Sequence, residues 1–498
     1  MKYHVKIMPA NVSFSVEENT NLMTLLRRES QPIEAPCGGK GSCRKCMVEI
    51  EGQDMLACQT FVDRDMTVQL KKRTSAEILM TDEYRRCSTD LENGEYALAF
   101  DIGTTTMVGY LLNHIGEQIA VASMLNPQSV YGADVVTRIQ AAIAGESGNL
   151  TVAVRMAIES LTEQMCTKVH ISTKKIKRVA VVANPCMHQL FFGIPVDNLA
   201  QIPFTPVLAK VDTIPAKEII QGCPNAQLFI VPDISGYVGA DTVGCILSTG
   251  MYENEKNILM VDIGTNGEMV LGNRNGMAAC STAAGPALEG ANIQFGMRGA
   301  KGAVDHVWAE NGKIYCHVIG EVKAAGICGS GLIDAAAVLL ENGMINKRGR
   351  IRTVKGTEPF DEYIREKDGQ RVVYLTEEIY LTQNDIREVQ LAKGAIAAGI
   401  LLMCEHMKVP VEEISEVLLA GAFGSYINPE SACRIGLLPK ELEGRIRAVG
   451  NAAGNGSKLM ACSKEQLQKT EIFLRKTESL ELASLPQFQH CFAQNMFF

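Results

Sequence analysis

The sequence lacks the features of a membrane-spanning, secreted or nucleic-acid-binding protein. Its longest helical apolar stretch, Ala395–Met403, is too short to span a bilayer. Met1–Pro9 alternates polar and apolar residues and has no unbroken apolar core of a signal peptide. The 48 Lys and Arg residues are outnumbered by 56 Asp and Glu residues, giving a formal net charge of −8, so no broad basic surface is expected. We therefore expect a cytoplasmic protein that binds neither nucleic acid nor a membrane.

The composition is otherwise that of a globular protein. Hydrophobic residues make up 46% and charged residues 21% of the 498 residues, which excludes a disordered or fibrous chain. At about 150 residues per domain, the length suggests roughly three domains. Sixteen cysteines are many for a cytosolic chain, and their uneven distribution is the first functional signal.

Four cysteines near the N-terminus follow the spacing C-x5-C-x2-C-x11-C: Cys37, Cys43, Cys46 and Cys58. The glycines among them let the backbone fold tightly and present N–H groups that can hydrogen-bond to thiolate or sulfide sulfur. Zinc sites usually pair two C-x2-C units, and only one is present here. A disulfide framework needs an oxidising compartment, and plain structural thiols are a further alternative. The pattern favours a [2Fe–2S] cluster.

The flanking sequence predicts a small domain over residues 1–74. Its elements are two strands, one helix and, after the cysteine loop, two more strands. They lie at Tyr3–Met8, Val12–Val16, Asn21–Glu29 (the helix), Met47–Ile50 and Met66–Leu70. This order and the cysteine loop resemble plant-type [2Fe–2S] ferredoxins of the β-grasp fold. The first cysteine gap is x5 rather than the usual x4, as in vertebrate-type members.

Residues 75–96 have mixed charge and few apolar residues, which predicts a solvated linker. A short surface helix over Ala76–Arg86 is the alternative, and Cys87 is interpreted as an ordinary thiol.

A hairpin pattern then occurs twice. Ala97–Asn113 and Asn257–Asn273 each contain an apolar run, Asp-Ile-Gly-Thr, a tight polar turn and a second apolar run. Glycine lets the backbone approach a phosphate, backbone N–H groups and threonine hydroxyls donate to its oxygens, and aspartate can hold Mg²⁺ through water. One such hairpin would mean little, but two at a domain-length offset, followed by the apolar strand and glycine turn of Val417–Gly424, predict a triphosphate clamp.

This layout resembles the ATPase superfamily of acetate and sugar kinases, actin and heat-shock chaperones over about residues 97–470. The resemblance implies a first phosphate loop at Asp101–Thr106, a second at Asp262–Glu268 and an adenosine loop at Ala420–Gly424. It also implies two duplicated α/β lobes, which we call lobe I (97–255) and lobe II (256–498, with a C-terminal segment). The whole chain is thus expected to be a multidomain α+β and α/β protein.

From this resemblance we expect ATP, Mg²⁺ and a defined set of site residues. Asp101, Asp262 and Asp241 are the expected catalytic residues. The expected nucleotide-binding residues are Gly103, Thr104, Thr105, Thr106, Gly264, Thr265, Asn266, Gly285, Gly329, Gly421 and Gly424.

Several assignments in this set keep an alternative. Asp241 either positions the attacking water or caps a helix near Thr242. The glycine-rich turns at Ser281–Gly290 and Gly326–Asp334 precede helices and suit anions, but Gly329 and Gly331 are equally suited to close helix packing at the hinge. Cys328 reads as a packed core thiol. Gly450–Gly456 suits adenine or an ordinary loop, and His188 is better explained as a hydrogen-bonded structural residue.

The pairing of a ferredoxin with this ATPase fold resembles the reductive activators of corrinoid proteins. The matching motifs span nearly the whole chain: CGGKGSCRKC at 37–46, DIGTTT at 101–106, NPCMH at 184–188, DISGYVGADT at 233–242, DIGTNGE at 262–268, CGSGLID at 328–334 and LAGAFG at 419–424. Longer members have an extra domain between ferredoxin and ATPase. Since Asp101 follows Cys58 so closely, we expect that middle domain to be absent.

The resemblance implies an ATP-dependent reductase that returns inactive Co(II) to Co(I) in a corrinoid protein of an anaerobic methyltransferase system. Plant-type clusters have potentials near about −400 mV, and the cobalt couple is usually lower, so ATP is needed. The methyl donor, such as an aromatic methyl ether in O-demethylation or a methylamine, and the electron donor stay open, and a homodimer is possible. The rival functions are activation of another low-potential metalloenzyme, nucleotide-dependent redox sensing, and phosphorylation of a small metabolite.

Overall fold

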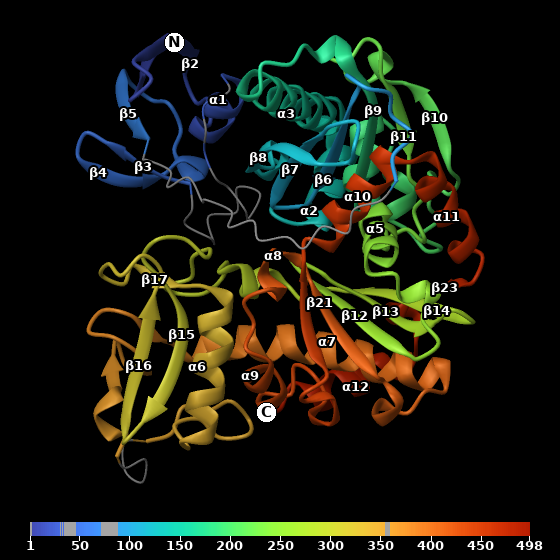
Figure 1. Cartoon of the computed structure of the whole chain (residues 1–498). Coiled ribbons are helices and arrows are strands. Elements are labelled where there is room, and N and C mark those ends of the chain that lie inside the picture. The colour runs from blue at the N-terminus through green and yellow to red at the C-terminus, as the bar shows by residue number, and fades with distance from the viewer. Residues whose placement is uncertain (1, 30, 32, 34–45, 71–87, 354–358) are drawn as a thin grey trace.

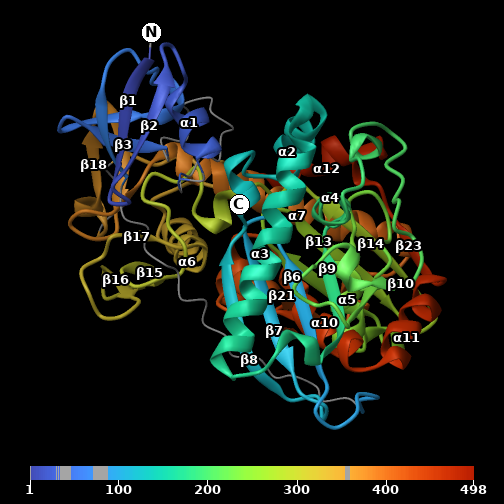
Figure 2. The same ribbon diagram turned by 90° about the horizontal axis from the view of Figure 1, so that it is seen from above.

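The computed structural model describes residues 2–29, 31, 33, 46–70, 88–353 and 359–498. Figure 1 shows three parts: the N-terminal domain in blue, lobe I above and lobe II below. Seen from above, the N-terminal domain lies at the side of the two lobes (Figure 2).

The N-terminal domain is a five-stranded sheet in the order β2-β1-β5-β3-β4, with α1 packed on it. Strands β1 and β5 are parallel and the other pairs are antiparallel. Alternate apolar side chains of the strands and the apolar face of α1 fill its core. The elements are β1 (Lys2–Met8), β2 (Val12–Glu17), α1 (Leu22–Arg28), β3 (Met47–Ile50), β4 (Gln53–Leu56) and β5 (Met66–Leu70). All the predicted elements are present, and β4 is an additional strand.

Lobe I contains a six-stranded sheet in the order β10-β11-β9-β6-β7-β8. Its strands are β6 (Tyr96–Ile102), β7 (Thr106–Leu112), β8 (Gln118–Leu125), β9 (Ile176–Ala183), β10 (Asp212–Pro215) and β11 (Gln227–Ile230). Its helices are α2 (Val135–Ala141), α3 (Ser147–Lys168), α4 (Pro185–Phe192) and α5 (Ala240–Thr249). Helices α2–α4 pack their apolar residues on one face of the sheet.

Lobe II repeats this arrangement with a sheet in the order β22-β21-β12-β13-β14-β23. Its strands are β12 (Ile258–Ile263), β13 (Gly267–Asn273), β14 (Gly276–Thr282), β21 (Glu416–Ala420), β22 (Ile446–Gly450) and β23 (Thr477–Ser479). Its helices are α6 (Gly329–Glu341), α7 (Gln383–Met407), α8 (Gly421–Gly424), α9 (Pro429–Arg434), α10 (Ala452–Cys462), α11 (Lys464–Leu474) and α12 (Phe488–Asn495).

Two small three-stranded sheets extend lobe II. The first has the order β16-β15-β17 and the second β18-β19-β20. Their strands are β15 (Ala303–Glu310), β16 (Lys313–Val318), β17 (Gly326–Ile327), β18 (Ile364–Lys367), β19 (Gln370–Tyr374) and β20 (Tyr380–Leu381).

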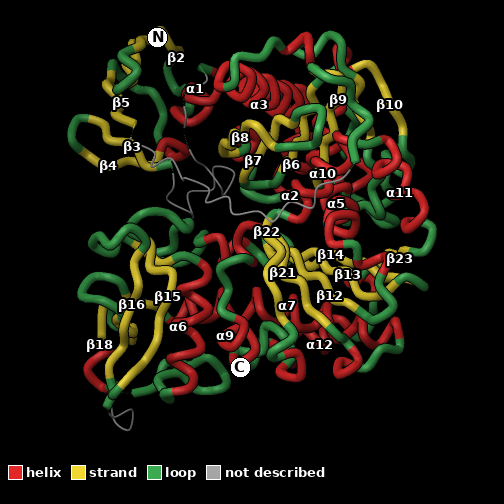
Figure 3. Tube along the Cα trace, viewed as in Figure 1, coloured by secondary structure: helices red, strands yellow, loops and turns green. Residues whose placement is uncertain are grey.

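Helices α5 and α10 lie between the two large sheets (Figure 3). Helix α10 comes from the C-terminal part of the chain, yet it packs on α5 and on strands β6 and β9 of lobe I. A Cβ on Gly456 would lie 2.1 Å from the carbonyl oxygen of Gly244, so the glycines allow the two helix backbones to touch. Residues 450–456 are therefore not an ordinary loop, because they end β22 and begin α10. Contact of this segment with adenine stays a prediction.

The end of the predicted linker, residues 88–95, is mostly exposed, but parts of it contact lobe I. Asp90 forms an ion pair with Arg178, and its backbone N–H donates to Cys462 O over 3.3 Å. Leu91 is buried in the core shared by the two lobes. The remaining linker residues 71–87 lie outside the described residues.

Among the helices that the structure describes, none combines the length and apolar character needed to cross a membrane.

Candidate functional site

The two repeated hairpins meet through their turns. Gly103 N–H donates to Thr106 O and Gly264 N–H donates to Asn266 O, each over 2.9 Å, so a glycine N–H closes each turn, with one residue fewer enclosed in the second. A Cβ on Gly103 would lie 2.7 Å from Thr106 O, which excludes any larger residue there. Across the lobes, the hydroxyl oxygens of Thr105 and Thr265 are 3.4 Å apart.

A glutamate that the sequence analysis did not select joins the two turns. Thr105 donates to Glu289 Oε2 over 2.7 Å, and Thr265 donates to Glu289 Oε1 over 3.0 Å. Glu289 ends the short 3-10 helix η8 (Pro286–Glu289), which starts after Gly285 and is followed by Gly290 in the left-handed region at φ +80°. One carboxylate thus accepts hydrogen bonds from both lobes.

Three polar side chains of lobe I form hydrogen bonds with Gly103 and Thr104 in the turn of the first hairpin. Asn126 donates to Gly103 O over 2.8 Å, the Arg138 guanidinium donates to Thr104 O, and Asn184 donates to the Thr104 hydroxyl over 3.1 Å. Arg138 is fully buried, and this burial lowers the pKa of Arg138 to about 10, so it stays charged at neutral pH. The Thr104 hydroxyl thus accepts a hydrogen bond from within lobe I.

Four carboxylates gather beside the turns: Asp101, Asp241, Asp262 and Glu268. Asp262 and Glu268 are directly paired across β12 and β13. Burial, with the charges of Asp262 and Asp101 beside it, raises the pKa of Asp241 to about 8, and burial raises the pKa of Asp262 to about 6. Burial and the nearby Asp241 and Asp262 also raise the pKa of Glu268.

Oxygen donors of this kind suit Mg²⁺. No three His, Cys, Asp or Glu side chains within the described part of the chain are placed to hold a metal ion directly. A Mg²⁺ ion at these carboxylates would therefore need water or phosphate oxygens to complete its coordination.

Asp241 lies in the first turn of α5 and accepts from Thr242 N–H over 2.8 Å. Asp241 does not cap α5, because the N-cap is Gly239 and no side chain makes a cap bond there. The role of Asp241 in positioning water stays a prediction.

The third predicted segment reaches the same place. Strand β21 runs parallel to β12, with Ala420 paired to Asp262, and Gly421 follows at φ +86°. A Cβ on Gly421 would lie 2.4 Å from Asp262 Oδ1. Helix α8, which Gly424 ends, therefore begins directly against the second hairpin.

Asn451 is a second residue that the sequence analysis did not select. It is the N-cap of α10, where its side-chain oxygen accepts from Gly454 N–H over 2.7 Å. Its amide nitrogen donates to Asp101 Oδ2 over 2.8 Å. The Asn-Ala-Ala-Gly capping pattern was visible in the sequence, but nothing there placed it beside Asp101.

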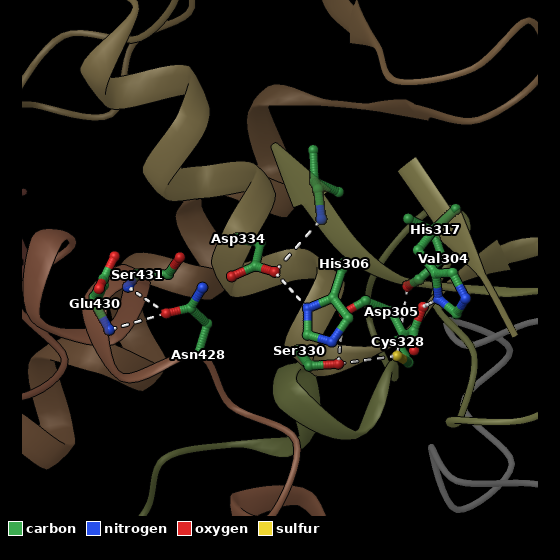
Figure 4. Close-up of polar contacts among 11 residues, drawn as sticks. Val304, Asp305, His306, His317, Cys328, Ser330, Asp334, Asn428, Glu430 and Ser431 are labelled. Carbon is green, nitrogen blue, oxygen red and sulfur yellow. Dashed lines mark hydrogen bonds and ion pairs between the residues drawn. The ribbon is translucent and has the colours of Figure 1, made fainter. Parts of the chain in front are cut away.

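The motif at 328–334 packs behind η8. A Cβ on Gly329 would lie 2.0 Å from Leu288 O, which is the close helix packing that the sequence allowed as an alternative. Cys328 is a buried thiol that donates to Val304 O over 3.4 Å, and Ser330 donates to Asp305 O over 2.9 Å. Figure 4 shows these polar groups turned toward β15, where Asp334 also pairs with His306.

His188 is buried and paired with a carboxylate, which fits the hydrogen-bonded structural residue that the sequence predicts. Its ring Nδ1 lies 3.1 Å from Asp233 Oδ1, and both side chains are fully buried. The same Asp233 oxygen accepts from Ala240 N–H over 3.0 Å at the start of α5, so the pair joins α4 to α5.

The predicted cluster ligands are partly described. Cys46 and Cys58 lie buried in the core of the N-terminal domain, with sulfur atoms 3.3 Å apart, too far for a disulfide. Two thiols facing each other at this distance fit the ligands of a cluster. Cys37 and Cys43 lie outside the described residues.

Comparisons with known proteins agree with this geometry. A family model for a 2Fe-2S iron-sulfur cluster binding domain matches residues 5–69, a model of the RACo middle region matches 96–254, and a model of the C-terminal ASKHA domain of RACo matches 256–498. The expected absence of a middle domain is therefore corrected: a middle region, as this family defines it, is present within lobe I.

Two curated relatives and one solved structure match over most or all of the chain. The corrinoid activation enzyme RamQ of Eubacterium limosum is 32% identical, with 94% of each chain covered. The [Co(II) methylated amine-specific corrinoid protein] reductase of Methanosarcina barkeri is 26% identical and covers 69% of this chain and 66% of its own. A reductive activator for a corrinoid, iron-sulfur protein superposes with a TM-score of 0.74 at 27% identity, covering 100% of this chain and 98% of that one. The chain therefore belongs to the RACo family of corrinoid activators, which joins a [2Fe–2S] ferredoxin domain to an ASKHA ATPase domain.

Proposed function

We propose that this protein uses ATP to transfer one electron to a corrinoid protein and so returns its cobalt from Co(II) to Co(I). The observation that carries the proposal is the meeting of Thr105 and Thr265 across the lobes, in a chain that also holds a ferredoxin domain. Relatives named for corrinoid activation and corrinoid protein reduction support the same substrate class.

The nucleotide would bind between the lobes. The backbone turns at Gly103 and Gly264 and the hydroxyls of Thr105 and Thr265 would donate to its phosphate oxygens. Asp101 and Asp262 would hold Mg²⁺ through water, and Asp241, next to both, would orient the attacking water. Helix α8 at Gly421–Gly424 would border the adenosine.

The ferredoxin domain would supply the electron. Cys37, Cys43, Cys46 and Cys58 would hold the [2Fe–2S] cluster, which takes up and releases one electron at a time. Moving that electron to a couple of lower potential costs about 2.3 kcal/mol per 100 mV. The protein would meet this cost by binding the corrinoid protein differently in its open and closed lobe arrangements, because a ligand shifts an equilibrium only by its differential affinity.

ATP hydrolysis by the full-length, cluster-loaded protein tests this function. We expect hydrolysis to rise when a Co(II) corrinoid protein is added and to fall again when that protein is supplied as Co(I). An ATP hydrolysis rate that does not change when the corrinoid protein is added would contradict the proposal and favour activation of another metalloenzyme. The absence of any hydrolysis would favour a nucleotide-binding redox sensor.

A further inference from the structure

Glu289 occupies the centre of the proposed nucleotide site. Its two carboxylate oxygens accept from Thr105 of lobe I at 2.7 Å and Thr265 of lobe II at 3.0 Å. These are the same hydroxyl groups that a phosphoryl group between the turns would need as donors. Each hydroxyl has one proton to donate, so Glu289 and a phosphoryl group compete for both.

We propose that Glu289 is a built-in competitor of the nucleotide, which ties the two lobes together in the nucleotide-free protein and is displaced by the terminal phosphates of ATP. This inference rests on the proposed function, because it assumes that nucleotide binds between the two turns. It adds that binding must break an existing bridge between the lobes.

Electrostatics supports the displacement. A carboxylate and a phosphate repel each other at close range, and Asp101, Asp241, Asp262 and Glu268 already make the site acidic. The cation that faces Glu289 from behind the first turn is the buried Arg138, whose charge interacts with the carboxylate. Arg138 is held by Thr104 O and Gly132 O, so it stays in place when Glu289 leaves.

Packing explains why Glu289 reaches both turns. A Cβ on Gly290 would lie 2.6 Å from Met297 N, and one on Gly329 would lie 2.0 Å from Leu288 O. The backbone on either side of η8 is therefore closely enclosed, and η8 also packs on α6 and α7. The backbone that carries the Glu289 carboxylate is closely packed. Displacement of the carboxylate therefore requires rotation of its side chain or movement of η8 against α6.

Nucleotide affinity tests the competition. We would measure binding of AMP-PNP with Mg²⁺ to the full-length, cluster-loaded protein and to its Glu289→Gln and Glu289→Ala variants by calorimetry. Gln keeps the shape but loses the charge, and Ala removes the bridge. Both should bind AMP-PNP at least about fivefold more tightly than the wild type, the lower end of usual coupling between ligands. The control is Glu310→Gln, at an exposed position on β15, which should bind like the wild type.

Lobe separation provides a second readout. Small-angle scattering should show that nucleotide-free Glu289→Ala is more expanded than the nucleotide-free wild type, and that AMP-PNP makes both equally compact. Unchanged or weaker AMP-PNP binding by both Glu289 variants would overturn the inference. If binding is unchanged and ATP hydrolysis is slower, Glu289 would instead be assigned to water activation. Failure of the wild type itself to bind AMP-PNP would instead contradict the proposed function.

Discussion

At the scale of single residues, the site depends on hydroxyl groups whose positions are set by short backbone turns. Thr105 and Thr265 lie in the turns of the two hairpins, one position apart in the repeated motif, and each turn is closed by a glycine N–H. Donors fixed before a ligand arrives stabilise developing charge without reorganising during the reaction. The two short sequence repeats were informative because their turns meet across the lobes.

Replacing Thr265 by Val should slow ATP hydrolysis on the order of a hundredfold, because one preorganised donor to the phosphates is lost. The side chain keeps its shape, so the thermal unfolding midpoint should change little. Steady-state hydrolysis by the full-length protein measures the effect. The matched control is Thr67→Val on the exposed side of β5, and equal rates for the two variants would contradict the role of Thr265.

The carboxylate group predicts a pH-dependent stability. Asp241 and Asp262 have pKa values raised to about 8 and about 6 by burial, whereas unfolded aspartate titrates near about 4. The folded protein therefore binds more protons than the unfolded chain between these values, and its free energy of unfolding should fall as the pH rises from about 4 to about 8. Urea unfolding in EDTA without nucleotide measures this decline.

The variant Asp241→Asn should flatten the upper part of that decline, since the amide resembles the neutral acid. At the alkaline end of the range it should be more stable than the wild type. Asp63→Asn, at an exposed position of the N-terminal domain, serves as the control. Identical pH dependence in Asp241→Asn and the wild type would show that Asp241 is not the group that titrates.

The sequence was enough to select candidate site residues inside a motif. It was not enough to select residues that reach the site from distant parts of the chain. Asp101, Thr105 and Thr265 were predicted because their hairpins repeat. Glu289 was missed because its segment was judged by its glycines, and Asn451 because its partner Asp101 is so distant in the chain. Contact of Thr104 with a ligand stays a prediction, and the sequence did not show that its hydroxyl accepts from Asn184 at another strand end.

At the scale of secondary-structure elements, α5 and α10 connect the lobes. They lie between the two large sheets. Helix α5 carries Asp241, and Asn451 caps α10. Their close approach depends on small residues, since Gly244 and Gly456 face each other. The distance between the two helices therefore sets the distance between Asp241 and Asn451, which donates to Asp101.

Replacing Gly456 by Ala should destabilise the protein by about 1–3 kcal/mol, the usual cost of overpacking, because the new methyl group would lie 2.1 Å from Gly244 O. ATP hydrolysis should fall as well, since Asp241 and Asn451 move apart. The same change at Gly148 in α3, where nothing lies within 4 Å, should be neutral or stabilising by up to about 1 kcal/mol. Urea unfolding compares the two, and equal effects would contradict the packing argument.

The elements that were predicted have local signals. The alternating strands of the ferredoxin domain and both hairpins follow from hydrophobic periodicity and turn residues. Strand β4 is short and only its last residue is partly buried, so it has no such signal. The return of α10 to lobe I is a tertiary arrangement: its apolar residues indicate burial, but they do not show against which sheet.

At the scale of the whole molecule, the chain is divided between an electron-carrying domain and a nucleotide-binding pair of lobes. The core of the ferredoxin domain is separate from the cores of the lobes within the described residues. Asp90 and Leu91 attach the chain firmly to lobe I before β6. Movement of the ferredoxin domain toward a partner would thus depend on the chain before residue 88.

Replacing Cys46 by Ser should reduce iron content and abolish cobalt reduction while nucleotide binding stays as in the wild type, since the two sites lie in different domains. Iron analysis, the visible spectrum and calorimetry with AMP-PNP measure these effects. Cys491→Ser in α12, a free cysteine outside the ferredoxin domain, should retain the cluster. Loss of nucleotide binding in Cys46→Ser would contradict the independence of the two parts.

Deleting residues 76–86 should slow cobalt reduction but leave basal ATP hydrolysis unchanged. The deletion shortens the connection and keeps Asp90 and Leu91, whose contacts with lobe I a longer deletion would remove. Rates of Co(I) formation and of phosphate release, measured on the same preparation, separate the two effects. Unchanged cobalt reduction would contradict the need for movement of the ferredoxin domain.

The central claim is tested most directly by anaerobic absorbance spectroscopy of a Co(II) corrinoid protein mixed with the reduced, cluster-loaded protein. The account predicts that the Co(I) spectrum forms when ATP and Mg²⁺ are present and does not form when ATP is omitted. Co(I) formation at the same rate without ATP, or none with ATP despite an intact cluster and bound nucleotide, would contradict ATP-dependent reductive activation.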